Sequence, residues 1–195
     1  MSRSTWSGNP PSNDHEARLR LGQAALRCVV NTGLHKTTMS DIAREAGVAR
    51  PTLYKHFKTK NDAIIFAIDA AGLEFAQAVK EFASQFDSAE ERIIEIIVFV
   101  FNELPRQEHL SLALDPDLSQ ALGERAFVEE ATLAFSRIAI GPVIELRPDL
   151  RKDGEEMAEV MSRFAISLIM FPGRFKNSED ELRAFVKRRL IPALI

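Results

Sequence analysis

The chain lacks most of what catalysis or metal binding requires. Its 195 residues contain one cysteine, which excludes an intrachain disulfide and a paired-cysteine metal site. The four histidines are scattered, and there is no nucleophile elbow, zinc-protease motif, phosphate-binding loop or dinucleotide fingerprint. The acidic pairs Glu129–Glu130 and Glu155–Glu156 are typical of solvated helix surfaces. We therefore expect a protein that is not an enzyme and that has neither a cofactor nor a metal site.

Long apolar runs are missing too. The longest, such as Ile96–Phe101, have six residues, whereas a helix needs about 20 to cross a bilayer. The first fourteen residues, MSRSTWSGNPPSND, are polar and contain two prolines, so they lack the apolar stretch of a secretory signal. These features predict a cytoplasmic protein that makes no membrane contact.

Strand-like alternation and internal repeats are also absent from the sequence. Apolar residues recur at helical spacing instead, which predicts an all-α fold. Charge is divided unevenly along the chain. Residues 1–60 contain ten Lys or Arg and four Asp or Glu, a balance of +6, whereas residues 61–195 contain fifteen and twenty-four, a balance of −9. A basic front suits contact with phosphate, although a short segment can reach such a balance by chance.

The segment Thr37–Lys60, TTMSDIAREAGVARPTLYKHFKTK, predicts two short helices joined by a tight turn. Thr38 and Asp41 have the spacing of a capping box, so the first helix begins here. Gly47 ends it, because glycine tolerates the left-handed backbone of a helix end. Pro51 suits the first turn of the next helix, where its missing N–H costs little. This arrangement is a helix-turn-helix, whose second helix can enter a DNA major groove.

The second helix carries the donors that DNA recognition needs. Arg50 is the expected base reader, because its planar guanidinium can bond two acceptors of guanine. Lys55 points the same way about one turn later and suits a base or a phosphate, and Thr52 suits a thymine methyl or a phosphate. Leu53 and Phe57 are interpreted as core residues.

Together with the helix that precedes it, this segment resembles the TetR family of bacterial one-component repressors. The likeness covers roughly residues 15–68 and depends on T-T-M-S-D-I-A-R-E-A-G-V, P-T-L-Y-K-H-F and K-T-K at the family's spacing. Ala49 is a departure, because many members have a Ser or Thr cap there. Tyr54, His56 and Lys60 match family positions that typically bind phosphate. With these included, the expected DNA contacts are Thr38, Arg50, Pro51, Thr52, Tyr54, Lys55, His56 and Lys60.

Three parts are expected. They are a flexible arm over residues 1–14, a helix-turn-helix DNA-binding domain over 15–60, and, as the resemblance implies, a helical effector-binding and dimerisation domain over 61–195. Within the arm, a DNA contact by Arg3 is an alternative to simple disorder. A first helix is expected from about His15 to Thr32, with core positions at Leu21, Ala25, Cys28 and Val29.

Capping pairs mark the start of the fourth helix and of three helices of the back half, each with a carboxylate three residues after the cap. The pairs are Thr59 with Asp62, Ser88 with Glu91, Asp153 with Glu156, and Ser178 with Glu181. Loops are expected at Gly141–Pro142 and at Pro148. Further helical sequence lies between Pro116 and Ala139, with a break near Gly123.

The helix that follows Ser88 is apolar on nearly every side, which is typical of the centre of a domain. It is the expected wall of an effector cavity, and a filled core without a ligand is the alternative. An aromatic lining suits a hydrophobic effector, whereas the acidic charge of this domain suits a cationic one. The candidate ligand residues are Glu95, Phe99, Phe101, Glu103, His109, Phe135 and Met161.

Two apolar stripes near the end of the chain predict a dimer interface. Such helices from two subunits can form a four-helix bundle with two-fold symmetry, and packing against their own domain is the alternative. The candidate interface residues are Met157, Val160, Met161, Phe164, Leu168, Phe171, Leu182, Phe185, Val186 and Leu190. A dimer places two reading helices about 34–36 Å apart, so the operator should be an inverted repeat.

These features predict a sequence-specific transcriptional regulator that binds double-stranded DNA. The resemblance implies a homodimeric repressor that an unidentified small molecule releases from its operator. An effector-independent DNA-binding protein and an activator of the same fold remain alternatives. A cavity in the second domain would separate a repressor from the first of these, whereas activation depends on where the operator lies.

Overall fold

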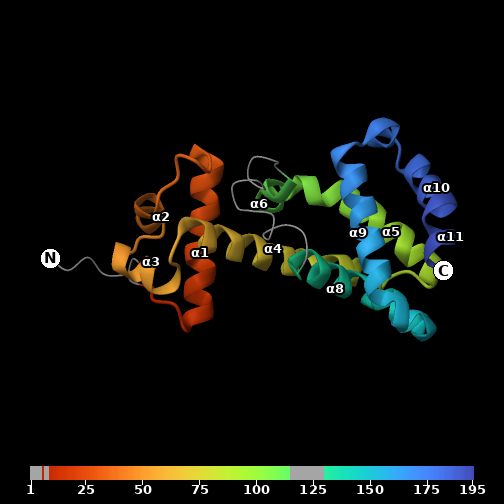
Figure 1. Cartoon of the computed structure of the whole chain (residues 1–195), viewed down its shortest axis with the longest axis horizontal. Helices are drawn as coiled ribbons and strands as arrows, with labels where there is room; N and C mark the ends of the chain where they lie inside the picture. Colours follow the sequence, from red (N-terminus) through yellow and green to blue (C-terminus); the bar gives the residue numbers. More distant parts are fainter. Residues whose placement is uncertain (1–5, 7–8, 115–129) are drawn as a thin grey trace. The chain divides into compact units, whose positions relative to one another are not determined.

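The computed structural model describes residues 6, 9–114 and 130–195, and every regular element among them is a helix (Figure 1). The predicted all-α fold is therefore confirmed. The chain separates into two compact units, and the boundary between them falls at Ala71–Gly72, within α4 (Lys60–Ala83). No helix formed by the described residues is long and apolar enough to span a membrane.

The first unit contains α1 (Asp14–Thr32), α2 (Met39–Glu45), α3 (Arg50–His56) and the beginning of α4. The side chain of Asn13 caps α1 by accepting a hydrogen bond from the Glu16 amide, and Gly33 ends the helix with a φ of 83°. The expected first helix is confirmed. Its four predicted core positions are buried together with apolar residues from the rest of the unit, namely Leu21, Ala25, Cys28, Val29, Ile42, Leu53, Phe57 and Ile64.

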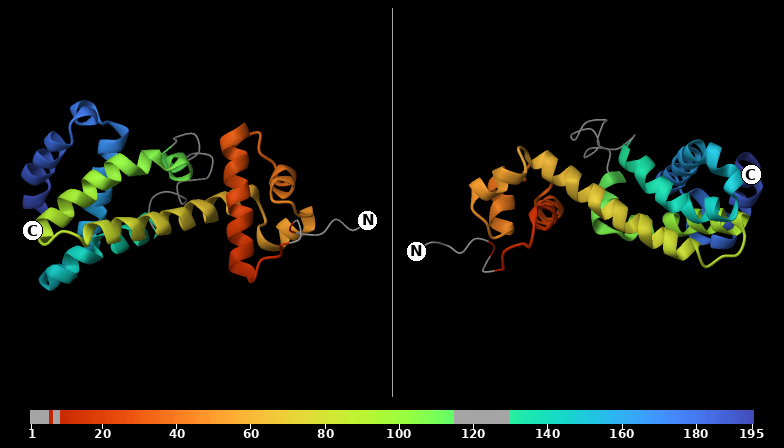
Figure 2. Two further views of the ribbon diagram at one scale, coloured as in Figure 1. Left: turned by 180° about the vertical axis from the view of Figure 1, so that it is seen from behind. Right: turned by 90° about the horizontal axis from the view of Figure 1, so that it is seen from below.

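α1 crosses the beginning of α4 at Gly22 (Figure 2). A Cβ atom added to Gly22 would lie 2.8 Å from the Cβ of Ala67 and 3.3 Å from the carbonyl oxygen of Ala63. Because packed side chains do not approach so closely, only a residue without a Cβ lets the two backbones meet here. Gly22 thereby sets the distance between α1 and α4.

The second unit begins within α4 and continues through the helices of the back half. Its described elements are α5 (Ala89–Glu103), η2 (Leu104–Arg106), α6 (Glu108–Ser111), η3 (Leu112–Leu114), α8 (Glu130–Leu146), η5 (Pro148–Asp153), α9 (Gly154–Met170), η6 (Gly173–Asn177), α10 (Glu179–Arg189) and α11 (Ile191–Leu194). α5 packs against α8, α9 and α10, and its side chains are buried on nearly every side. The prediction of a central helix is confirmed.

Some expectations concern residues that the structure does not describe. Arg3 lies among them, and so does the break expected near Gly123. The helical sequence expected between Pro116 and Ala139 reaches the described chain as α8, which begins at Glu130.

Three of the four predicted capping pairs that follow the helix-turn-helix are present. Thr59 and Asp62 cap α4 reciprocally, and Ser88 and Ser178 cap α5 and α10. The prediction at Asp153 is wrong, because η5 runs directly into α9 and leaves Asp153 with a φ of −99° and a ψ of 3°. A capping side chain reaches the first amides of a helix from an extended backbone, and Asp153 does not have one.

The loop expected at Gly141–Pro142 is also wrong, since α8 continues through both residues. A proline inside a helix removes one backbone hydrogen bond and crowds the preceding turn. Here Ala139, Ile140 and Val143 are buried, and the carbonyl of Pro142 accepts a hydrogen bond from the buried guanidinium of Arg92 on α5. Tertiary packing of this face of α8 therefore outweighs the local preference of the proline.

The close crossing of α1 and α4 predicts opposite effects for two substitutions. Gly22→Ala should destabilise the protein by about 1–3 kcal/mol, because the added methyl forces the helices apart. Gly72→Ala is the control: its methyl meets no atom within 4 Å, so the higher helix propensity of alanine should stabilise α4 by about 0.5–1 kcal/mol. Urea unfolding of both variants measures the two free energies. A Gly22 variant as stable as the parent would contradict the close crossing.

Candidate nucleic-acid interface

A sharp turn joins α2 to α3 and sets the orientation of α3 relative to α2. The backbone of Gly47 is left-handed, with a φ of 66°, and the Val48 amide donates to the carbonyl of Ala43 at 2.9 Å. Ala49 follows with an extended backbone, and α3 then begins with Pro51 in its first turn. The predicted helix-turn-helix is confirmed in each of these local features.

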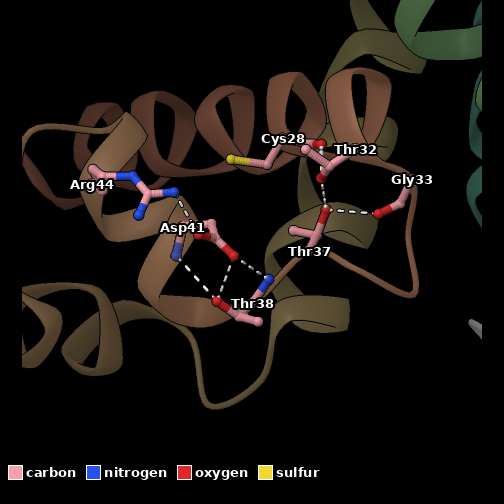
Figure 3. A network of polar contacts seen from close by, with 7 residues as sticks. All are labelled: Cys28, Thr32, Gly33, Thr37, Thr38, Asp41 and Arg44. Atoms are coloured by element: carbon pink, nitrogen blue, oxygen red, sulfur yellow. Dashed lines mark hydrogen bonds and ion pairs between the residues drawn. The ribbon is translucent and has the colours of Figure 1, made fainter.

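A polar network holds the loop before α2 against the end of α1 (Figure 3). The Thr37 side chain is buried, and its hydroxyl donates to the carbonyl of Gly33 at 2.9 Å. The same hydroxyl lies 3.2 Å from that of Thr32, which donates in turn to the carbonyl of Cys28 at 2.8 Å. The C-terminal turn of α1 and the N-terminus of α2 are thus joined by side-chain hydroxyls.

Thr38 and Asp41 form the predicted capping box at the start of α2 (Figure 3). The Thr38 hydroxyl accepts from the Asp41 amide at 3.2 Å, and the Asp41 carboxylate accepts from the Thr38 amide at 3.1 Å. Donation by the Thr38 hydroxyl, followed by its amide and by Arg44, holds the pKa of Asp41 below its usual value. The ionised carboxylate lies at the positive end of the helix dipole, which further favours this start of α2.

α3 has a buried face and a free face. Leu53 is fully buried, and Phe57, at the end of the helix, is 2% exposed. Arg50, Tyr54 and Lys55 are exposed, and their side chains make no hydrogen bond or ion pair with another described residue. A guanidinium, a phenol and an ammonium therefore remain available, and these are groups with which proteins contact base edges and phosphates.

The other two predicted contacts on α3 differ in exposure. Pro51 is exposed beside the free face, whereas Thr52 is half-buried. At the start of α2, the Thr38 side chain is exposed although it also serves as the cap. The structure therefore brings Thr38, Pro51 and Thr52 to the same helix-turn-helix segment, and their contacts with DNA stay predictions.

Positive charge elsewhere in this unit is partly neutralised by acidic neighbours. Arg20 pairs with Glu16, Arg27 pairs with Glu45 at 2.7 Å, and Arg44 pairs with Asp41 at 2.5 Å. Arg50 and Lys55, in contrast, have no acidic partner in the part of the chain that the structure describes. Unpaired positive charge therefore remains on α3, where it favours the approach of a polyanion.

Two of the predicted phosphate contacts are already engaged inside the protein. The ring of His56 is 8% exposed, and its Nδ1 lies 3.0 Å from the carboxylate of Asp14. The ammonium of Lys60 donates to the carbonyls of Leu34 at 2.7 Å and of Thr37 at 2.9 Å. The sequence did not indicate these partners, because they are distant along the chain and are brought near only by the packing of α1, α3 and α4.

A cation–aromatic contact anchors the end of α3 and was also missed from the sequence. The guanidinium of Arg18 on α1 lies over the rings of Phe57 and Phe66, 5.1 and 4.4 Å from their centroids. The two rings pack on each other, with centroids 5.6 Å apart. The only signal in the sequence was a charged residue next to Ala17 on a helix whose other inward residues are apolar.

In the second unit, the structure brings some candidate effector residues together. Phe75 of α4 stacks on Phe99 and on Phe135, with 5.9 Å between ring centroids in both pairs. Phe82 stacks on Phe99 at 4.6 Å. We call these four residues the aromatic cluster. Of the other apolar candidates, Met161 is buried and Phe101 is half-buried.

The candidate polar anchors are largely engaged elsewhere. Glu95 accepts two hydrogen bonds from Arg183 of α10, at 2.7 and 3.1 Å. Glu103 accepts from Arg106 at 2.6 Å. His109 has a buried Nδ1 that finds no hydrogen-bond partner among the described residues. Of the three, only His109 has a buried side-chain polar atom without a partner among the described residues.

An open pocket of about 370 Å³ lies elsewhere in this unit, on α8, η5 and α9. Its lining residues are Arg137, Ile140, Gly141, Ile144, Glu145, Arg151, Gly154 and Glu155. None of the seven candidate ligand residues is among them, so those candidates stay a prediction.

The stripes predicted to form a dimer interface face mostly inward. Six of their residues are buried within the chain: Met157, Met161, Leu168, Leu182, Val186 and Leu190. Phe164 and Phe185 stack on each other with centroids 5.7 Å apart. Val160 and Phe171 remain exposed, Phe171 by 78%. Ile166 and Met170 are exposed as well, and the stripes predicted from the sequence did not include them.

Comparison with known proteins assigns the helix-turn-helix to a family. Residues 22–65 match the sequence model of the family described as bacterial regulatory proteins, tetR family. The match extends from the middle of α1, through α2 and α3, into α4. The helix-turn-helix of this chain is thus similar to that of the TetR family.

The curated proteins to which this chain is similar are named as regulators. The fatty acid metabolism regulator protein of Bacillus subtilis (strain 168) is 27% identical over 128 residues, which are 65% of this chain and 66% of that protein. The HTH-type transcriptional regulator AcrR of Shigella flexneri is 26% identical over 119 residues, 60% of this chain and 55% of that protein. The chain thus matches less than two thirds of the length of either relative.

Solved structures share the fold over most of the chain. The TetR family repressor AlkX from Dietzia sp. strain DQ12-45-1b has a TM-score of 0.67 and 20% identity, covering 91% of this chain and 94% of that one. Salmonella enterica GusR has a TM-score of 0.64 and 21% identity, covering 91% and 95%. At these identities the likeness establishes a common fold.

Ala49 lacks a side-chain acceptor, and α3 accordingly has no side-chain capping bond. Ala49→Thr should stabilise the protein by about 0.5–1 kcal/mol, because the extended backbone at this position lets a hydroxyl accept from the Thr52 amide. Ala49→Val, which has the same shape without the acceptor, should give no such gain. Thermal unfolding of the three proteins compares their stabilities. Equal midpoints for the Thr and Val variants would show that α3 gains nothing from a cap.

Proposed function

We propose that this protein is a sequence-specific DNA-binding regulator of transcription of the TetR family. In this proposal it is a cytoplasmic homodimeric repressor without enzymatic activity. It binds an inverted-repeat operator and leaves the DNA when a small molecule binds to the second unit. The observation that carries the proposal is the free face of α3, where Arg50, Tyr54 and Lys55 are exposed and have no partner among the described residues.

The residues of the free face of α3 have different proposed roles in DNA binding, according to their chemistry. Arg50 is the proposed base reader, since two of its N–H groups match the O6 and N7 acceptors of guanine in the major groove. Tyr54 and Lys55 suit phosphates, which fix the orientation of the protein and add affinity without naming a sequence. Binding should therefore weaken steeply as salt rises.

A homodimer would explain how so small a reading surface becomes specific. Two copies of α3 about 34–36 Å apart would meet successive major grooves on one side of the duplex. Support for self-association comes from the apolar residues left exposed on and next to α9, which are Val160, Ile166, Met170 and Phe171. Burying them against a second copy would remove apolar surface from water.

An apolar effector suits the second unit best. The aromatic cluster offers adjacent phenyl rings from α4, α5 and α8, whereas Glu95 and Glu103 are already paired with arginines. One relative is named as a regulator of fatty acid metabolism, which agrees with an apolar ligand. A preference of about 1–3 kcal/mol for the released state changes operator affinity by roughly 5–150-fold.

Replacing Arg50 tests base reading directly. DNA selected from a random pool supplies the operator, and fluorescence anisotropy compares it with a scrambled duplex. Arg50→Ala should reduce the operator-to-scrambled affinity ratio by about 5–150-fold for each bidentate contact to guanine that is lost, and a homodimer loses two such contacts. Arg44→Ala serves as the control, because this arginine of α2 is already paired with Asp41. Equal loss of affinity for both duplexes in the Arg50 variant would refute its role as a base reader.

Fatty acids test the effector and separate the rival functions. Palmitate should raise the thermal midpoint of the protein and release it from the operator, with a smaller effect in Phe99→Ala, because that variant removes the ring shared by two stacked pairs. Operator binding that no apolar ligand alters would instead favour an effector-independent regulator. Whether binding represses or activates depends on the distance between operator and promoter, which a reporter gene measures.

A further inference from the structure

A side chain of α4 holds the loop between α1 and α2. This loop, residues 33–38, ends at the cap of α2. The half-buried ammonium of Lys60 donates to the carbonyls of Leu34 and Thr37, at 2.7 and 2.9 Å. Two of its three N–H groups are therefore used within the protein. The exposed Lys55 ammonium, in contrast, has no partner among the described residues.

The position of Lys60 in its own helix makes this contact informative. Lys60 is the first residue of α4, which is 24 residues long. A cation at a helix N-terminus faces the positive end of the dipole, which disfavours it there. Two carbonyl oxygens within hydrogen-bond distance offset this repulsion, and the ammonium in turn gives these two acceptors of an irregular loop a donor. The contact of Lys60 with these two carbonyls is thus part of the packing of the first unit.

The loop held by Lys60 also determines where α2 begins. Thr37 is bonded from both sides, since its carbonyl accepts from Lys60 and its buried hydroxyl donates to the carbonyl of Gly33. Thr38 follows directly and caps α2. Because only a few residues, including the turn at Gly47, separate the two helices, the orientation of α3 depends on that of α2.

We propose that Lys60 is a positioning residue for DNA binding, which acts through the carbonyls of Leu34 and Thr37 and not through a phosphate. It holds the loop that sets α2, and thereby the angle at which α3 meets the groove. This inference depends on the proposed DNA-binding function. It goes beyond that function by assigning to Lys60 a structural role within the first unit.

The salt dependence of operator binding distinguishes positioning from phosphate contact. Lys60→Met keeps the length of the side chain and removes its donors, so affinity for the selected operator should fall about tenfold. The slope of log K against log salt should stay unchanged. Lys55→Met is the matched control, and its slope should fall by about 0.9 for each phosphate that the variant no longer binds, or about 1.8 for a dimer. Lys60→Arg, which restores donors, should recover most of the affinity.

Two results of this titration would overturn the inference. One is a Lys60→Met slope that falls as far as that of Lys55→Met, which would make Lys60 a direct phosphate contact. The other is operator affinity equal to that of the parent. Circular dichroism at the assay temperature confirms that each variant is folded, so that a loss of affinity reports position and not unfolding.

Hydrogen exchange on the free protein tests the loop without DNA. In the parent, the Thr37 amide donates to the carbonyl of Gly33 and the Asp41 amide to the Thr38 hydroxyl. Both amides should exchange faster in Lys60→Met, whereas those in the middle of α1 should not change. Unchanged exchange at Thr37 and Asp41 would overturn the inference. If the parent bound no DNA at all, the proposed function would fail, and this measurement would still decide whether Lys60 holds the loop.

Thr37→Val provides a second route to the same loop. It removes the hydroxyl bonded to Gly33 while leaving every charge in place, so operator affinity should fall with an unchanged salt slope. It also keeps the inference testable if Lys60→Met does not fold. Combined with Lys60→Met, it should cost less than the sum of the two single effects, because both act on one loop. A folded Thr37→Val protein with the operator affinity of the parent would show that the position of the loop does not matter.

Discussion

The recognition segment depends on the packing that holds α3, a helix of seven residues, against the core of the first unit. A helix as short as α3 has little stability of its own, because nucleation is unfavourable and few backbone bonds follow it. Burial of Leu53 and Phe57 supplies what is missing, and the guanidinium of Arg18 closes over Phe57 and Phe66. The buried face of α3 attaches the helix to the rest of the unit. The side-chain donors on its exposed face are therefore free of contacts with other described residues.

The same division between holding and reading explains why cations of this unit differ in role. Arg50 and Lys55 are exposed and without partners in the described chain, and they suit contacts with DNA. Lys60 and Arg18 are directed inward, to carbonyls and to aromatic rings. Arg27 and Arg44 are balanced by acids. Counting positive residues therefore overstates the surface that is open to phosphate.

The second unit shows what polar groups do in a helical core. The Arg92 guanidinium joins α5 to the carbonyls of Phe86 and Pro142, and Glu95 joins α5 to Arg183 of α10. Removing one partner from such a contact leaves a buried polar group unsatisfied, so these pairs select one packing of the helices. Glu95 was a reasonable ligand anchor when only its own helix was considered. With its partner known, it is better understood as a connection between helices.

Much of the first unit was predictable because its signals are local. Asp41 reaches the Thr38 amide within one turn, Gly47 takes its left-handed backbone from its own lack of a Cβ, and the spacing of Leu53 and Phe57 marks a buried face. The same holds for the caps at Thr59, Ser88 and Ser178. Where a local signal competed with packing, prediction failed. Pro142 lies inside α8 because the packing of its buried neighbours outweighs its missing N–H. Asp153 does not cap α9 because it is the last residue of η5, so its backbone is not extended.

The amino-acid sequence by itself determined an all-helical chain and the position of the helix-turn-helix, because caps, turns and apolar periodicity act within a few residues. Only the tertiary structure decided which side chains are free. His56 meets Asp14, Lys60 meets the loop before α2, and Glu95 meets Arg183 because helices distant along the chain pack together. Partners of this kind depend on three-dimensional proximity, and spacing along the sequence does not encode them.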